Sequence, residues 1–382
     1  MTEAGPGEWI DLSRCDDARD VVHRVAACLA QGGVVGLASE TVYCLASSAL
    51  NPAGVARLRA LRGDVEPRPL TILVKGPEEA ADWAPDVPEV AARLARRSWP
   101  GPVSLIFPPP ARSGLLDRLP ADVRSLISPS GEVALRCPEE AMLREALRFC
   151  PAPLVLGLVR AADGSAATTA EPLRNLAGVD MAIDSGPTRL GRVATAVRVQ
   201  GDTWSIAREG AVDAATIAAR AGRLLAFVCT GNTCRSPMAE AICKLMLARR
   251  LGCRPDELEA RGYSVVSAGV AASRGAPAAG HAAEVVRSMG GSLDRHRSRP
   301  IGLDLVRQAD RLFAMTADHL DLLLDLAPEA RPIATLLDPE GRDVPDPFGS
   351  DMTTYRRTSE AIERMLASRL DELGVPGGSP SA

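Results

Sequence analysis

The stretch that decides the fold of the second half reads LLAFVCTGNTCRSPMAEAICKLML, over residues 224–247. Its five apolar residues at 224–228 predict a buried strand. Pro237 predicts the first turn of a helix, because a proline there costs no hydrogen bond. The polar loop between strand and helix therefore sits at a helix N-terminus. The N–H groups and the dipole of a helix end make such a loop an anion site.

Two residues of this loop point to chemistry on a bound phosphate. Cys229 directly follows the strand, and a thiol beside a helix N-terminus and an arginine ionises readily to the nucleophilic thiolate. Arg235 presents a planar fork of donors that grips two phosphate oxygens. We therefore predict a cysteine-dependent phosphatase, with Cys229 as nucleophile and Arg235 as phosphate clamp. The remaining predicted phosphate-binding residues are Thr230, Gly231, Asn232, Thr233, Cys234 and Ser236.

A candidate acid lies further along the chain. Transfer of a phosphoryl group to a thiolate needs an acid for the leaving group. Asp346 stands between Pro345 and Pro347, which stiffen the loop after the last predicted strand. A stiff loop can hold a carboxyl group over the phosphate, although an ordinary turn aspartate is the alternative interpretation.

Three separated motifs carry a family resemblance. CTGNTCRSP, SAGV (267–270) and DPFG (346–349) occur in this order and resemble the low-molecular-weight protein tyrosine phosphatases over about residues 224–373. The resemblance implies a four-stranded parallel sheet with helices on both faces and no cofactor. It also implies that Cys229 forms a phosphocysteine, while Asp346 protonates the leaving group and then activates water. Cys234 would trap oxidised Cys229 as a reversible disulfide, or simply fill the loop.

The substrate is left open between two phosphoryl groups. Thr233 occupies a loop position where the tyrosine-directed branch usually carries a bulkier apolar residue, so the loop resembles the protein-arginine phosphatase branch. We favour phosphoarginine over phosphotyrosine on this ground. The thioredoxin-coupled arsenate reductases share the fold but need two further cysteines after the loop, and this chain has none beyond Cys253.

The first half resembles the YrdC-like threonylcarbamoyl-AMP synthases over about residues 20–212. Five segments carry the resemblance: 32–46, 68–76, 98–107, 133–138 and 206–212. It implies a twisted α/β sheet around a concave site, where ATP, threonine and bicarbonate react to give the precursor of a tRNA modification. ATP and tRNA are thus the cofactor and partner implied for this half. The nucleotide-binding residues implied are Thr41, Arg62, Arg68, Arg136, Thr195 and Arg208.

Departures from that family concern its polar motifs. Asp64 places a carboxylate where a phosphate-binding arginine is expected, and the segments 159–161 and 194–196 lose polar side chains. We therefore predict a domain that keeps the fold without the synthase activity. An active synthase with an altered site is one alternative, and a module that binds a nucleotide, RNA or protein partner is another.

Length and composition predict the organisation of the chain. Its 382 residues suffice for two domains, which we place at 1–212 and 223–376, with a linker at 213–222 and a disordered tail at 377–382. The net charge of −4 gives no sign of a nucleic-acid surface.

Cysteine and histidine usage predicts the compartment and the absence of a metal. The nine cysteines have no disulfide-framework spacing, and no apolar run approaches the ~18 residues of a membrane span. We therefore expect a cytoplasmic protein that acts on a phosphorylated protein substrate without a membrane. His281, His296 and His319 are scattered, so we interpret them as surface or capping residues rather than metal ligands.

Overall fold

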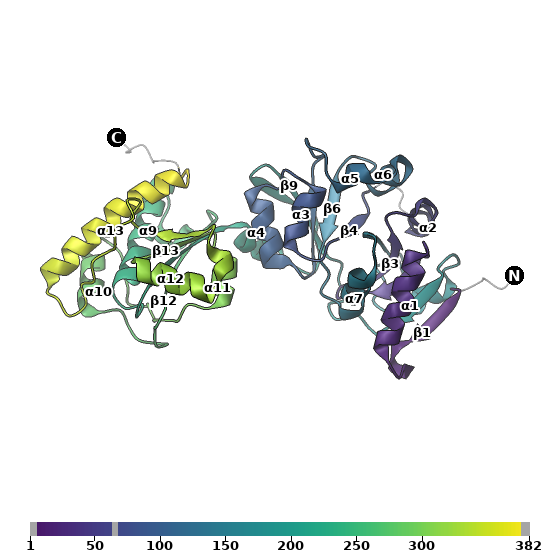
Figure 1. Cartoon of the computed structure of the whole chain (residues 1–382), viewed down its shortest axis with the longest axis horizontal. Coiled ribbons are helices and arrows are strands. Elements are labelled where there is room, and N and C mark those ends of the chain that lie inside the picture. The colour runs from purple at the N-terminus through teal and green to yellow at the C-terminus, as the bar shows by residue number, and fades with distance from the viewer. Residues whose placement is uncertain (1–5, 63–67, 376–382) are drawn as a thin grey trace. The chain divides into compact units, whose positions relative to one another are not determined.

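The computed structural model describes residues 6–62 and 68–375. The chain divides into two compact units, Met1–Arg220 and Ala221–Ala382. Figure 1 shows that each unit consists of a sheet with helices packed against it. The predicted linker at 213–222 contains helix α8 (Ala214–Ala221). The predicted tail at 377–382 and Asp64 lie outside the described residues.

The first unit is built on a ten-stranded mixed sheet with the order β1-β8-β2-β3-β7-β4-β6-β5-β9-β10. Its strands are β1 (Glu8–Asp11), β2 (Val35–Ala38), β3 (Tyr43–Ser48), β4 (Thr71–Leu73), β5 (Val103–Phe107), β6 (Val133–Arg136), β7 (Leu154–Leu158), β8 (Met181–Asp184), β9 (Thr195–Gln200) and β10 (Thr203–Arg208). Its other helices are α1 (Ala18–Ala30), α2 (Pro52–Arg62), α3 (Ala80–Trp83), α4 (Glu89–Ser98), α5 (Leu115–Arg118), α6 (Ala121–Ile127) and α7 (Ala141–Phe149).

Two features of this sheet bring Thr41 and Arg136 together. Strand β6 ends at Arg136, between the parallel neighbour β4 and the antiparallel neighbour β5. The turn from β2 to β3 is closed by Ser39, whose backbone N–H and hydroxyl both donate to the carbonyl of Val42, at 3.0 and 2.7 Å. This turn holds Thr41 near the end of β6, where its hydroxyl accepts a hydrogen bond from Arg136 at 3.2 Å.

The second unit is built on a four-stranded sheet with the order β12-β11-β13-β14, in which every pair is parallel. Its strands are β11 (Arg223–Cys229), β12 (Tyr263–Gly269), β13 (Arg311–Ala314) and β14 (Ala334–Leu336). Its helices are α9 (Arg235–Leu251), α10 (Gly280–Ser288), α11 (Leu303–Gln308), α12 (Ala317–Leu326) and α13 (Met352–Glu372).

Helices cover both faces of this sheet because side chains alternate along its central strand. Leu225 and Phe227 belong to the core with α9 and α13, while Ala226 and Val228 belong to the core with α11 and α12. The predicted two-domain α/β class, with a parallel four-stranded sheet between helices, is therefore confirmed. Among the described residues, no helix is both long and apolar enough to cross a membrane.

Candidate active site

The thiol of Cys229 lies at the C-terminal end of β11, where parallel sheets place their ligands. Its side chain is buried, and two polar groups contact its sulfur. The hydroxyl of Ser236 lies 3.0 Å from Sγ, and the backbone N–H of Asn232 donates to it at 3.3 Å. These contacts hold the sulfur at the start of the loop.

The loop after Cys229 forms a ring of backbone donors. Within the described residues, no acceptor is found for the N–H groups of Thr230, Gly231, Thr233 and Cys234. Helix α9 begins directly after them at Arg235. Unmatched N–H groups at a helix N-terminus attract an anion, so the loop is suited to three or more phosphate oxygens.

Asn232 holds this loop in its conformation. Its φ of 55° is the only positive value among the described non-glycine residues, and asparagine tolerates that region better than most side chains. Its amide donates to Ser236 at 3.0 Å and to Ser267 at 2.9 Å, and its amide oxygen accepts the N–H of Arg299 at 2.9 Å. The donors are thereby oriented before a ligand binds.

Arg235 and Asp346 are brought together although they are 111 positions apart. Nη2 of Arg235 lies 2.6 Å from Oδ2 of Asp346, and Nη1 donates to the carbonyl of Val344 at 3.2 Å. The Arg235 side chain is 6% exposed but that of Asp346 is 49% exposed. Asp346 is therefore a carboxylate at the mouth of the site that an incoming anion can displace from the arginine.

Cys234 contacts a tyrosine of helix α13 and its own neighbour in the loop. Its sulfur lies 3.2 Å from the hydroxyl of Tyr355 on α13, and 3.7 Å from the hydroxyl of Thr233. Burial, with the hydrogen bond to Cys234, raises the pKa of Tyr355, so the phenol stays protonated. Cys229 and Cys234 are both free thiols in this structure.

Two histidines that the sequence left aside contact the loop. His319 lies 2.7 Å, through Nε2, from the hydroxyl of Thr230, and His296 lies 2.8 Å from the carbonyl of Asn232. Of the two interpretations of His319, the surface one is wrong, since the residue is 5% exposed, whereas its contacts with the N-cap Thr316 agree with the capping one. The only local signal for it is Thr316, three positions earlier, which caps α12. No group of three potential metal-ligating side chains occurs among the residues that the structure describes.

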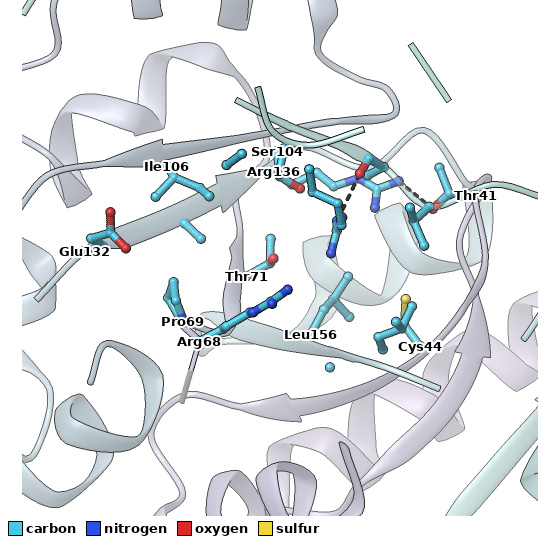
Figure 2. A pocket seen from close by; sticks show the side chains of 18 of the residues that line it. Thr41, Cys44, Arg68, Pro69, Thr71, Ser104, Ile106, Glu132, Arg136 and Leu156 are labelled. Atoms are coloured by element: carbon cyan, nitrogen blue, oxygen red, sulfur yellow. Dashed lines mark hydrogen bonds between the residues drawn. The ribbon is translucent and has the colours of Figure 1, made fainter. Parts of the chain in front are cut away.

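The first unit contains a cavity of about 420 Å³ that collects most of its predicted residues. Thr41, Arg62, Arg68, Arg136 and Arg208 line it, over an apolar floor that includes Ile106 and Leu156. Figure 2 shows Arg68 and Arg136 on opposite sides of the space, with Thr71 and Leu156 on the strands between them.

The cavity is strongly cationic. Among the described residues five arginines but one glutamate line it, and that glutamate, Glu132, pairs with Arg198 at 2.8 Å. Burial within the cavity walls, together with the charges of Arg136 and Arg62, lowers the pKa of Arg208. Arg208 therefore lies in a positively charged part of the cavity.

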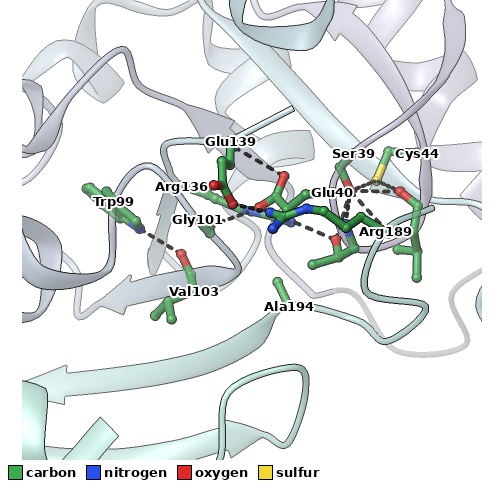
Figure 3. A network of polar contacts seen from close by, with 12 residues as sticks. Ser39, Glu40, Cys44, Trp99, Gly101, Val103, Arg136, Glu139, Arg189 and Ala194 are labelled. Atoms are coloured by element: carbon green, nitrogen blue, oxygen red, sulfur yellow. Dashed lines mark hydrogen bonds and ion pairs between the residues drawn. The ribbon is translucent and has the colours of Figure 1, made fainter. Parts of the chain in front are cut away.

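Arg136 has a fixed partner of its own. Its Nη2 lies 2.6 Å from Oε1 of Glu40, and the two side chains are 5% and 2% exposed. The other oxygen of Glu40 accepts the N–H of Glu139 at 3.2 Å, and Nε of Arg136 donates to the carbonyl of Gly101 at 3.3 Å. Figure 3 shows Arg136 enclosed within this polar network.

Thr195 does not join the other predicted residues. It is buried, and its hydroxyl donates to the carbonyl of Val212 at 2.6 Å and accepts the N–H of the same residue at 2.9 Å. The cavity wall at this point comes from its neighbours Ala194 and Ala196. Thr195 thus joins β9 to the segment that leads towards α8.

A buried thiol at the end of a parallel strand, followed by a loop of backbone N–H groups and by an arginine at the start of helix α9, is the arrangement of a cysteine-dependent phosphatase. A family model described as low molecular weight phosphotyrosine protein phosphatase matches residues 224–375. Through its second unit, the chain belongs to that family. A second family model, for Sua5, YciO and YrdC proteins and described as telomere recombination, matches residues 27–210.

Three relatives illustrate these similarities. A protein-arginine-phosphatase of Bacillus subtilis is 36% identical over 151 residues, which are 38% of this chain and 94% of that protein. The low molecular weight protein-tyrosine-phosphatase Etp of Escherichia coli K12 is 32% identical over 139 residues, 36% of this chain and 85% of Etp. A threonylcarbamoyl-AMP synthase of Pyrococcus abyssi is 31% identical over 178 residues, 46% of this chain but only 49% of that protein.

Proposed function

We propose that the second unit hydrolyses phosphorylated protein side chains through a phosphocysteine on Cys229, with phosphoarginine as the preferred substrate over phosphotyrosine. The observation that carries the proposal is the Cys229 sulfur, which accepts the N–H of Asn232 and contacts the Ser236 hydroxyl beside a loop of N–H groups without acceptors among the described residues. A phosphoryl group bound by those N–H groups has its phosphorus next to the thiolate. The backbone donors and Arg235 then stabilise the charge that develops on the phosphoryl oxygens.

The proposed reaction has two steps, which are the formation and the hydrolysis of the phosphocysteine. The Cys229 thiolate attacks phosphorus while the bond from phosphorus to the leaving nitrogen or oxygen breaks. Asp346, which takes up a proton from solvent once it has separated from Arg235, gives that proton to the leaving atom. Water then attacks the phosphocysteine, Asp346 takes its proton, and inorganic phosphate leaves as the thiolate re-forms. A bound phosphoryl group competes for Arg235, which frees Asp346 from its ion pair for this acid and base work.

The preference for phosphoarginine rests on the loop residue Thr233. It has a short polar side chain whose hydroxyl lies near the Cys234 sulfur, so a hydroxyl rather than a bulky apolar group stands at this point of the loop. The B. subtilis protein-arginine-phosphatase, at 36% identity, supports the same preference.

Two peptides of one sequence, carrying phosphoarginine or phosphotyrosine, test the proposal. We expect a higher kcat/KM for phosphoarginine and a loss of that preference in Thr233→Ile. A clear preference of the wild type for phosphotyrosine would overturn the substrate assignment. Full activity in Cys229→Ser would overturn the mechanism itself.

A second function is favoured by the arginine-lined cavity of the first unit. We propose that it binds a nucleotide such as ATP, with Arg62, Arg68 and Arg208 toward the phosphates and the apolar floor beneath the base. In a domain with synthase activity, bound ATP would supply its α-phosphorus for adenylyl transfer, with pyrophosphate as the leaving group. The loss of polar side chains at Ala194 and Ala196, which line the cavity, supports nucleotide binding without the synthase reaction.

Calorimetry with ATP and exchange of labelled pyrophosphate into ATP separate the possibilities. We expect binding of ATP but no exchange when threonine and bicarbonate are added. Robust exchange would identify an active synthase, and the absence of any nucleotide binding would remove this second function.

A further inference from the structure

His319 stands between a helix cap and the phosphate-binding loop, and its two ring nitrogens have different partners. The hydroxyl of Thr316, the N-cap of α12, accepts the backbone N–H of His319 at 3.3 Å and lies 2.8 Å from Nδ1. The direction of this second hydrogen bond depends on the tautomer of the ring. When the Thr316 hydroxyl donates its one proton to Nδ1, the neutral ring carries its own proton on Nε2.

In that tautomer the ring also donates the next hydrogen bond. Nε2 of His319 lies 2.7 Å from the hydroxyl oxygen of Thr230, which then accepts. Thr230 directly follows Cys229 and is exposed. No other partner of its hydroxyl occurs in the described part of the chain, so its proton is available to a ligand of the loop.

The surroundings of His319 keep it neutral at neutral pH. Burial and then the positive charge of Arg235 lower its pKa, while the carboxylates of Asp318, Asp346 and Asp343 oppose that shift. Asp343 also accepts the N–H of Ala317, the first residue of α12, at 2.9 Å. Through α12 and His319, the loop that carries Asp346 is thus connected to the loop that carries Cys229.

We propose that His319 is a positioning residue of the phosphatase reaction, which turns the Thr230 hydroxyl into an oriented hydrogen-bond donor for the phosphoryl group. The proposal rests on the phosphatase function proposed above. A donor fixed in advance needs no reorganisation when charge develops on a phosphoryl oxygen, which is where such a bond assists most. The effect is therefore expected in kcat rather than in KM.

Full-length variants test this with p-nitrophenyl phosphate as substrate. His319→Ala and Thr230→Val should each lower kcat about tenfold, the value of one hydrogen bond to a charged group. The double variant should lose no more than either single variant, because both remove the same bond. His319→Gln and Thr230→Ser keep a donor and a hydroxyl, respectively, and should retain kcat within about threefold.

Controls separate this proposal from the function on which it rests. If Cys229→Ser turns over p-nitrophenyl phosphate as fast as the wild type, the proposed function fails. If turnover depends on Cys229 but Thr230→Val equals the wild type, or if the two losses multiply in the double variant, only the role of His319 is overturned. Thr230 is exposed, so its variants report on kcat without loss of the fold, and His23→Ala in the first unit is the matched histidine control.

Discussion

Arg235 and Arg136 are both buried arginines that hold a carboxylate at 2.6 Å, but the carboxylates differ in their freedom to leave. Asp346 is 49% exposed, so water solvates it when Arg235 turns to a phosphate. Glu40 is 2% exposed, and separation from Arg136 would leave a charge buried without a partner. A buried charge in that state costs several kcal/mol.

The difference shows that a buried arginine in a concave site is not by itself a ligand-binding residue. Arg235 exchanges one anion for another, whereas Arg136 closes a network that also includes Glu139 and Gly101. The nucleotide binding proposed for the first unit therefore rests on cavity arginines outside that network, such as Arg208.

Arg136→Met should destabilise the first unit by about 3–5 kcal/mol, because it leaves Glu40 buried and unpaired. Urea unfolding followed by tryptophan fluorescence measures this, since every tryptophan of the chain belongs to the first unit: Trp9, Trp83, Trp99 and Trp204. Adding Glu40→Gln should restore part of the loss. Arg14→Met, at a side chain that is 86% exposed, should change stability by less than about 0.5 kcal/mol. A loss in Arg136→Met as small as this control would contradict the comparison.

Arg235→Lys should lower kcat/KM for p-nitrophenyl phosphate by about 10²–10³-fold, since an ammonium group cannot replace the bidentate fork. The stability of the second unit should change little, because the exposed Asp346 remains hydrated. Steady-state kinetics and hydrogen exchange of β11 measure the two effects. Arg254→Lys, at a side chain that is 71% exposed, is the control for the chemical change. Large losses of both activity and stability would place Arg235 with Arg136 as a structural arginine.

The sequence predicted what lies close together along the chain better than what only the fold brings together. Cys229 and Arg235 belong to one strand-loop-helix unit, so their chemistry is visible in nine consecutive residues. His319 and Thr230 are 89 positions apart, and Glu40 and Arg136 are 96 apart. The local pattern does not show that the residues of either pair contact each other.

A different limit applies to residues whose position was predicted but whose contact was not. Arg136 lines the cavity as expected, but its charge is already neutralised by Glu40, which lies in the turn between β2 and β3. Thr195 lies one position from the cavity wall, and its hydroxyl serves the backbone of Val212 instead. The direction of a side chain depends on strand register and on partners across the sheet, and neither can be derived from composition or periodicity.

Arg208→Ala should weaken ATP binding about tenfold, since it removes one charge-assisted contact from the cavity. The pKa of Arg208, lowered by burial and by neighbouring arginines, implies that the free cavity gains slightly in stability when this charge is removed. Calorimetry and tryptophan-detected unfolding measure the two effects. The matched control is the double variant Glu132→Ala, Arg198→Ala, which removes a neutral ion pair from the same cavity. Equal losses of affinity in the two variants would show that Arg208 has no special role.

His319 should give the second unit a small loss of stability in acid. Burial and the charge of Arg235 lower its pKa in the folded unit, so the unfolded chain takes up the proton first. Stability is therefore complete above about pH 6.5, where an unfolded histidine is neutral, and falls as the pH drops below that value, by at most about 1.4 kcal/mol per pH unit.

Hydrogen exchange of β11 peptides between pH 8 and 5.5, corrected for intrinsic exchange rates, measures this slope. His319→Gln cannot take up the proton and should show a flatter profile, whereas His281→Gln should follow the wild type. Parallel profiles in all three proteins would mean that His319 titrates alike in the folded and unfolded chain. In that case neither burial of the ring nor the charge of Arg235 would shift the pKa of His319 in the folded unit.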